Sequence, residues 1–165
     1  MRTAQRITYP ADVDAVVAML SDPQFQRGRA ERLHPENLEC QVAPAGAGFR
    51  ARLSGTVPPS RLPAAASRLI RSAVAFTVTE AWAGAAADGT RAGDLTVSVQ
   101  GAPVKASGTM KMVPGQGTTT VELDLELRVS VPLVGRSLEE KALGLAGHVV
   151  RDEERRATAY LQARG

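Results

Sequence analysis

Cysteine is almost absent from this sequence, and so are aromatic residues and long apolar runs. Cys40 stands alone, so it has no partner within the chain for a disulfide, and a reducing compartment is its natural setting. Aromatic residues make up only 4% of the 165 residues. No apolar run reaches the roughly 18 residues that would indicate a membrane-spanning helix, and the opening MRTAQRITYP lacks the apolar stretch of a signal peptide. We therefore expect a soluble, cytoplasmic protein.

The motifs of the common enzyme classes are also missing. The sequence contains no nucleophile elbow, phosphate-binding loop or dinucleotide fingerprint. Its two histidines, His34 and His148, lie far apart and have no cysteine, histidine or carboxylate neighbour at ligand spacing, so we expect neither a metal nor another cofactor. A net charge of +3, from 20 basic and 17 acidic residues, is too balanced for a nucleic-acid-binding protein. No catalytic residue can be assigned from such a sequence, and no nucleic-acid partner is expected.

What the sequence does contain is a strict alternation of apolar and polar residues. The stretch VELDLELRVSV, residues 121–131, alternates at every position and is followed by Pro132. Because successive side chains of a strand point to opposite faces, this pattern predicts a strand with one dry and one wet face. Five earlier segments repeat the pattern, separated by the turn sequences PAGAG, GAAADG, GAP and PGQG or by a longer connection: 38–42, 49–53, 74–82, 95–99 and 104–112. Short turns between successive strands predict antiparallel neighbours.

Helical segments bracket this run of strands. A first strand over residues 2–9 is followed by a predicted helix over 11–20. Asp22 and Pro23 are typical of a second helix start, and that helix is expected to reach about residue 33. The last predicted helix covers about 137–164, although Gly144 and Gly147 weaken it. The order predicts a single α+β domain over 1–165, with a curved antiparallel sheet wrapped around the C-terminal helix.

Three segments carry a resemblance to a known superfamily. They are YPADVDAVVAMLSDPQF near the start, the run of hairpins, and the closing VSVPLVGRSLEEKALGLAGHVVRDEERRATAYL. Together they resemble the START-like, or polyketide-cyclase-like, superfamily (SRPBCC) with its helix-grip fold. More narrowly, EAW, GAPVKASGTMKM and PLVG resemble an actinobacterial family of uncharacterised START-like proteins. The resemblance implies a deep apolar cavity between the concave sheet and the last helix, occupied by lipids, sterols, polyketides or hormones.

The alternation indicates which residues would line that cavity. The dry faces of the strands and of the last helix give the candidate ligand-binding set: Phe76, Val78, Glu80, Trp82, Val97, Val99, Met110, Met112, Leu123, Leu125, Leu145 and Val149. The alternative is that Phe76, Trp82, Met110 and Met112 simply fill the core.

Glu80 is the exception on the dry face. A buried carboxylate needs a partner or a raised pKa. In a functional interpretation, Glu80 is a polar anchor for a ligand or a general acid. In a structural interpretation, a register slip returns it to water or it pairs with an arginine. We favour the structural interpretation. Glu153 raises the same question on the last helix, where Arg156 is the expected partner.

Residues 27–71 are locally basic, and the connection at 58–72 interrupts the strands. Leu62, Ala65, Ala66, Leu69 and Ile70 have helical spacing within this connection. A basic entrance that contacts anionic membranes peripherally, or binds anionic ligands, is one interpretation, and an ordinary solvated face is the one we favour. The arginines concerned are Arg27, Arg29, Arg32, Arg50, Arg52, Arg61, Arg68 and Arg71.

Three functions are consistent with these observations. The leading hypothesis is the binding, transport or sensing of a hydrophobic small molecule by a protein that is not an enzyme. The second is an aromatase- or cyclase-type enzyme acting on a polyketide, which would use Tyr9, Glu80, Glu153 or His148. The third is an interaction module with a filled core. The sequence does not distinguish a monomer from a dimer.

Overall fold

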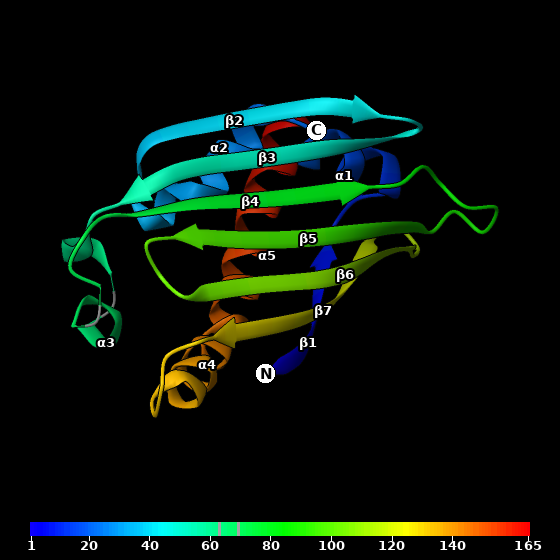
Figure 1. Cartoon of the computed structure of the whole chain (residues 1–165). Coiled ribbons are helices and arrows are strands. Elements are labelled where there is room, and N and C mark those ends of the chain that lie inside the picture. The colour runs from blue at the N-terminus through cyan, green and yellow to red at the C-terminus, as the bar shows by residue number, and fades with distance from the viewer. Residues whose placement is uncertain (63, 69) are drawn as a thin grey trace.

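The computed structural model describes residues 1–62, 64–68 and 70–165. Seven antiparallel strands form one sheet in the order β1-β7-β6-β5-β4-β3-β2 (Figure 1). Each strand from β2 to β6 pairs with the next strand along the chain, and β1 pairs with β7. The strands are β1 (Arg2–Tyr9), β2 (Glu36–Ala45), β3 (Gly48–Val57), β4 (Val74–Trp82), β5 (Arg91–Gln100), β6 (Val104–Pro114) and β7 (Thr119–Val129).

The helices α1, α2 and α5 lie behind one face of this sheet, whereas α3 lies beyond one end of it (Figure 1). The side chain of Asp12 accepts a hydrogen bond from the Ala15 amide at 2.9 Å and so caps α1, while Asp22 caps α2 just before Pro23. The helices are α1 (Val13–Leu20), α2 (Pro23–Ala30), α3 (Ala64–Ser67), α4 (Gly135–Gly144) and α5 (Ala146–Arg164), with 3-10 turns at Glu31–Leu33 and Pro59–Arg61. This is the helix-grip arrangement that the sequence predicted.

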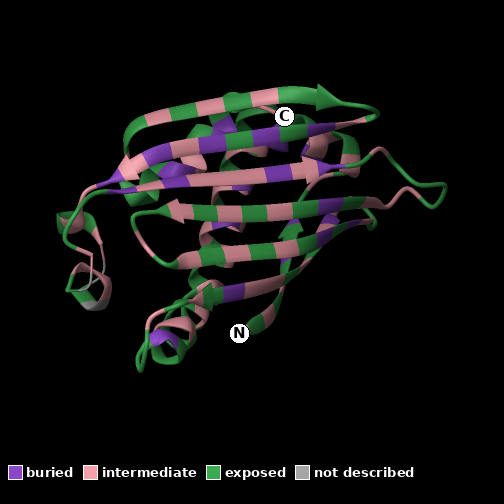
Figure 2. Cartoon of the chain, viewed as in Figure 1, coloured by how far each residue is buried: buried purple, intermediate pink, exposed green. Residues whose placement is uncertain are grey.

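The predicted alternation is confirmed by the strand register. One row of Cα partners crosses the sheet from β3 to β7 on the face toward the helices: Ala51, Glu80, Leu95, Gly108 and Leu125. Figure 2 shows buried or half-buried residues alternating with exposed ones along the strands. We call the face that carries this row the inner face.

Two separate apolar clusters cover parts of the inner face. The larger one packs β1, β3, β4, β6 and β7 against α1, α2 and α5, with Tyr9, Met19 and Met112 at its centre. The smaller one consists of Val57, Val74 and Phe76, against which the connection between β3 and β4 packs. Much of the middle of the inner face belongs to neither cluster.

The last helix is not continuous, contrary to the prediction. α4 ends at Gly144, α5 begins at Ala146, and between them the amide of Leu145 bonds to the carbonyl of Ala142 at 3.1 Å, which tightens the turn. Glycine is among the weakest helix formers, so Gly144 is a natural place for the axis to break.

Two smaller predictions also differ from the structure. β7 ends at Val129, two residues before the predicted end, because the next amide, that of Ser130, bonds to the carbonyl of Pro103 at 2.9 Å. In the 58–72 connection, the described residues with predicted helical spacing form only the short α3. Leu69 and the side chain of Ala65 lie outside the described residues.

Candidate functional site

A buried ionic network occupies the inner face at the level of α2. Arg29 Nη1 lies 2.7 Å from Glu80 Oε1, and Arg29 Nε lies 3.0 Å from Glu153 Oε2. Tyr9 Oη donates to the other oxygen of Glu153 at 3.1 Å. The four side chains come from β1, α2, β4 and α5, so the network joins four elements that are distant in sequence. Both glutamates are almost fully buried, at 7% and 6% side-chain exposure.

The surroundings of Arg29 and Tyr9 raise the pKa of both groups. Burial alone would lower the pKa of Arg29, but Glu153 and Glu80 outweigh it and raise that pKa, so the guanidinium stays charged. Burial, and then the charge of Glu153, raise the pKa of Tyr9 well above its usual value, so its phenol stays protonated. The network thus contains one cation, two carboxylates and a neutral hydroxyl donor.

The network settles the question of Glu80. The register places it on the inner face between Ala51 and Leu95, so a register slip toward water is wrong, and a salt bridge to an arginine is confirmed. The predicted partner of Glu153 is also wrong: Arg156 bonds to Asp152 at 2.9 Å, and Arg29 takes its place.

Arg29 is the residue that the sequence analysis misassigned. It was counted in a solvated basic region, yet its side chain is 20% exposed and lies between two carboxylates. A sequence signal did exist: Phe25 precedes Arg29 by four residues, so the two share a helix face, and Phe25 is the apolar residue that marks that face as buried. The other basic residues do not form one surface either, because Arg50 and Arg52 point to the outer face of β3.

Two polar atoms beside the network have no hydrogen-bond partner within the described part of the chain. They are Glu80 Oε2 and Trp82 Nε1, two positions apart on the inner face of β4. The indole of Trp82 lies over Gly93, where an added Cβ would be 2.7 Å from the ring. One acceptor and one donor are therefore available on the inner face of β4.

The predicted lining residues divide into two groups. Four of them, Phe76, Trp82, Met110 and Met112, are at most 7% exposed and belong to the packed clusters, as the filled-core alternative expected. Apart from Glu80 in the network, the others are half-buried on the strands or, at Leu145 and Val149, about half exposed beside the bend of the last helix. Of these, Leu123 packs against the larger cluster. The rest, together with Ala106, form what we call the inner apolar surface: Val78, Val97, Val99, Ala106, Leu125, Leu145 and Val149.

Exposure increases from Glu153 of α5 toward Leu145 at the bend. Glu153 is 5% exposed, Val149 one turn earlier is 42% exposed, and Leu145 two turns earlier is 53% exposed. Residues four apart lie on the same side of a helix, so these three share a face. The contact between helix and sheet is therefore tight at the network and open toward the bend. His148, the remaining catalytic candidate, is exposed and contacts Arg151, away from the network.

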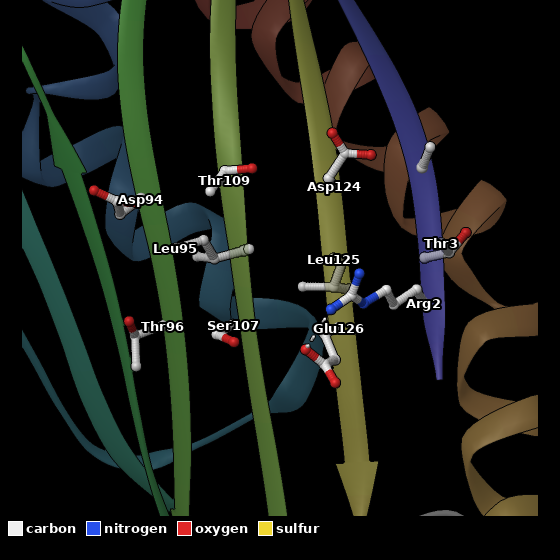
Figure 3. Close-up of a pocket in the computed structure, with 12 residues that line it drawn as sticks. Arg2, Thr3, Asp94, Leu95, Thr96, Ser107, Thr109, Asp124, Leu125 and Glu126 are labelled. Atoms are coloured by element: carbon white, nitrogen blue, oxygen red, sulfur yellow. Dashed lines mark ion pairs between the residues drawn. The ribbon is translucent and has the colours of Figure 1, made fainter.

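Two hollows of sizeable volume lie away from the inner apolar surface. One of about 840 Å³ lies over β5, β6, β7 and β1 on the outer face, with the helices behind the strands (Figure 3). Its polar side chains include Asp94, Asp124 and the ion pair of Arg2 with Glu126 at 3.6 Å. The second, of about 410 Å³, lies between α2 and α5 beside Phe25. Neither coincides with the inner apolar surface, although Leu125 borders the first.

Two searches of the described residues were negative. No group of three or more histidine, cysteine, aspartate or glutamate side chains is arranged to hold a metal ion within residues 1–62, 64–68 and 70–165. Over the same residues, no helix is long and apolar enough to cross a membrane.

The family follows from comparison with known sequences. Residues 4–161 match the family described as "Protein of unknown function (DUF2505)". The chain belongs to that family. No curated protein matches it.

Solved structures with the same fold include a START superfamily protein and a norcoclaurine synthase. A START superfamily protein from Mycobacterium smegmatis is 17% identical over 97% of this chain and 98% of its own, with a TM-score of 0.57. A norcoclaurine synthase point mutant from Thalictrum flavum is 13% identical over 100% of this chain and 96% of its own, with a TM-score of 0.56. The di-domain ARO/CYC BexL is 17% identical over 98% of this chain and 46% of its own, with a TM-score of 0.53. At these identities the likeness shows the fold, and the predicted helix-grip fold is confirmed.

Proposed function

We propose that the inner apolar surface binds one hydrophobic small molecule, lipid-like or polyketide-like, between the sheet and α5. The protein acts in this proposal as a carrier or sensor of that molecule. The observation that carries it is the exposure of Val149 and Leu145 on the side of the helix that faces inward at Glu153. Apolar side chains left exposed on an otherwise packed side are typical of a binding surface.

The strands offer a matching apolar floor. Val97 and Ala106 are cross-strand partners, and Val78 lies on the other side of Val97. All three are half-buried, and their side chains are aliphatic or small, so together they form a smooth surface without a hydrogen-bonding group. A ligand that covered this floor would gain about 25 cal/mol for each Å² of apolar area removed from water. This supports ligand binding over the interaction module with a filled core.

The polar atoms near the network would orient the ligand. Glu80 Oε2 can accept a hydrogen bond and Trp82 Nε1 can donate one; Glu80 lies one row and Trp82 two rows beyond the apolar floor. A hydroxyl group both donates and accepts, so a largely apolar molecule with a hydroxyl at one end fits this chemistry. An entirely apolar molecule would leave both atoms unsatisfied.

The likeness to solved structures is consistent with a site that holds a ligand. The norcoclaurine synthase mutant with this fold was solved in complex with a transition state analogue. That observation concerns the synthase, and for the present chain it indicates only that the fold accommodates small molecules.

Binding is tested with N-phenyl-1-naphthylamine, an uncharged apolar fluorophore. We expect saturable binding to the native protein, and an Ala106→Leu variant, which fills the floor, to bind at least about tenfold more weakly, equivalent to about 1.4 kcal/mol. Ser107→Leu is the matched control, because Ser107 is the adjacent residue on the outer face and is exposed. Val149→Ser removes an exposed apolar group without disturbing the core, and it should weaken binding several-fold.

Equal affinity of the Ala106 and Ser107 variants would place the fluorophore elsewhere and overturn the proposed site. Native mass spectrometry of the purified protein provides a second measurement. Consistently empty protein, together with no thermal shift across panels of lipids and polyketides, would count against ligand binding altogether.

A second candidate function is an aromatase- or cyclase-type enzyme, favoured by one observation. Tyr9, Glu80 and Glu153 converge on Arg29, so three of the four candidate acid–base groups share one location. Conversion of a bound polyketide, abolished by Glu80→Gln, would establish this candidate. Recovery of the polyketide unchanged would favour a carrier.

A further inference from the structure

The turn between β7 and α4 carries an exposed apolar tip, Leu133 and Val134. Leu133 is 105% exposed and the neighbouring Val134 is 40% exposed. The turn is held by its backbone, since the amide of Gly135 bonds to the carbonyl of Val131 at 2.9 Å. A Cβ on Gly135 would lie 2.2 Å from the carbonyl oxygen of Val129, so this close approach requires glycine.

Leu133 does not contribute to the stability of that turn. Its φ is +67°, the left-handed region that a leucine adopts only with strain. Asparagine and glycine accept this conformation more readily. A leucine that is both strained and fully exposed gains nothing in the free protein, which indicates a role outside it.

Three segments meet at the end of the sheet that carries this tip. The amide of Ser130 bonds to the carbonyl of Pro103 at 2.9 Å, which joins the tip to the turn between β5 and β6. Ala102 of that turn packs against the same small cluster as Leu62 and Ile70 of the connection between β3 and β4. Figure 1 shows these segments at the end where α3 and α4 lie. We call residues 58–62, 64–68, 70–73, 101–105 and 128–136 together the basic end.

Basic side chains outnumber acidic ones at the basic end. Its segments hold six basic residues and no aspartate or glutamate: Arg61, Arg68, Arg71, Lys105, Arg128 and Arg136. Four acids lie just outside the segments: Glu126 and Glu140 pair with Arg128 and Arg136, Glu139 accepts a hydrogen bond from the amide of Val129, and Glu36 is the register partner of Thr56. The turns at the opposite end of the sheet, 10–12, 44–48, 83–91 and 113–118, carry only Asp12, Asp88 and Arg91. The basic end therefore has an excess of positive charge that the opposite end lacks.

We infer that the basic end docks on anionic lipid bilayers, with Leu133 and Val134 entering the interface. A cationic surface around an exposed aliphatic tip matches a layer of negative headgroups over acyl chains. Nucleic acid is a poorer match, because the basic end contains no aromatic side chain on which bases stack. Val99 and Val78 of the inner apolar surface pack against the cluster beside this end, so docking would bring that surface close to the lipid.

The test is co-sedimentation with vesicles of phosphatidylcholine containing one third phosphatidylglycerol, compared with phosphatidylcholine alone. We expect binding to the anionic vesicles only, weakened by salt. Each basic residue near an anionic surface contributes about fivefold in affinity, so R61Q/R68Q/R71Q should bind about 100-fold more weakly. The matched control R6Q/R50Q/R155Q removes the same charge from exposed arginines elsewhere and should bind nearly as the native protein does.

Leu133→Asn separates insertion from charge and from folding. Asparagine accepts the left-handed backbone, so the urea midpoint should stay equal or rise, while vesicle binding falls by about tenfold. Leu133→Trp should bind more tightly, with a blue shift of its emission on adding vesicles, against the constant background of the buried Trp82.

Three results would overturn the inference. The first is no binding of the native protein to the anionic vesicles. The second is an equal loss in both triple variants, which would reduce the effect to overall charge. The third is tighter binding to a single-stranded oligonucleotide than to vesicles, with Leu133→Asn unchanged, which would assign the basic end to nucleic acid.

Discussion

Replacing Arg29 with methionine should destabilise the protein severely. The substitution keeps much of the side-chain volume but leaves Glu80 and Glu153 facing each other without their shared cation. Both carboxylates are within 3.0 Å of the guanidinium and at most 7% exposed, so water cannot take over its role. Removing one partner of a buried ion pair costs about 3–5 kcal/mol, because the remaining charge is buried and uncompensated. We expect a loss in that range at neutral pH.

The assay is urea unfolding followed by the fluorescence of Trp82, which is the only tryptophan in the sequence and is 3% exposed. Arg6→Met is the matched control. Arg6 also pairs with a glutamate, Glu122, at 3.2 Å, but its side chain is 70% exposed, so its loss should cost at most about 1 kcal/mol.

A rescue variant tests the cause of the loss. Combining Arg29→Met with Glu80→Gln and Glu153→Gln removes every charge of the network, and most of the lost stability should return. The reasoning is refuted if Arg29→Met costs no more than Arg6→Met. It also fails if the triple variant is less stable than Arg29→Met, since the penalty would then not come from uncompensated carboxylates.

Three further predictions concern stability. Burial, and then the charge of Glu153, raise the pKa of Tyr9 in the folded protein. The stability that the protonated phenol confers is therefore complete below about pH 10, the pKa of an unfolded tyrosine, and is lost as pH rises through the raised value. Tyr9→Phe should flatten this alkaline decline, measured as urea midpoints. Gly93→Ala should cost about 1–3 kcal/mol, measured the same way, because its Cβ would lie 2.7 Å from the Trp82 ring. Gly144→Ala should raise the free energy of unfolding by about 0.5–1 kcal/mol, because a Cβ there meets open space; an unchanged or lower melting temperature would contradict this.

The parts of the fold predicted correctly from the sequence were those set by local patterns. Side chains on a strand alternate by geometry, so the parity of the run 121–131 was enough to place Leu123 and Leu125 on the inner face, and the register confirms it. The consecutive residues Asp22 and Pro23 likewise marked the start of α2, because capping depends on neighbouring residues alone.

The features that sequence reasoning missed depend on contacts between distant residues. Arg29 is 51 residues from Glu80 and 124 from Glu153, so no local spacing joins them, and its charge alone pointed toward solvent. The bend at Leu145 was missed for a different reason. A glycine weakens a helix without fixing where the helix ends, and tertiary packing decides whether it breaks. Helical periodicity identified the face of Val149, but it carries no information on how much of that face is covered.

The most direct test of the account is a methyl NMR titration of the native protein with N-phenyl-1-naphthylamine. If the ligand lies between the sheet and α5, resonances of Val97, Val99 and Val149 should shift together and saturate at one equivalent, while those of Val16 and Leu20 in the closed core should stay in place. Shifts confined to Leu133 and Val134, or none at all, would contradict the proposed binding site.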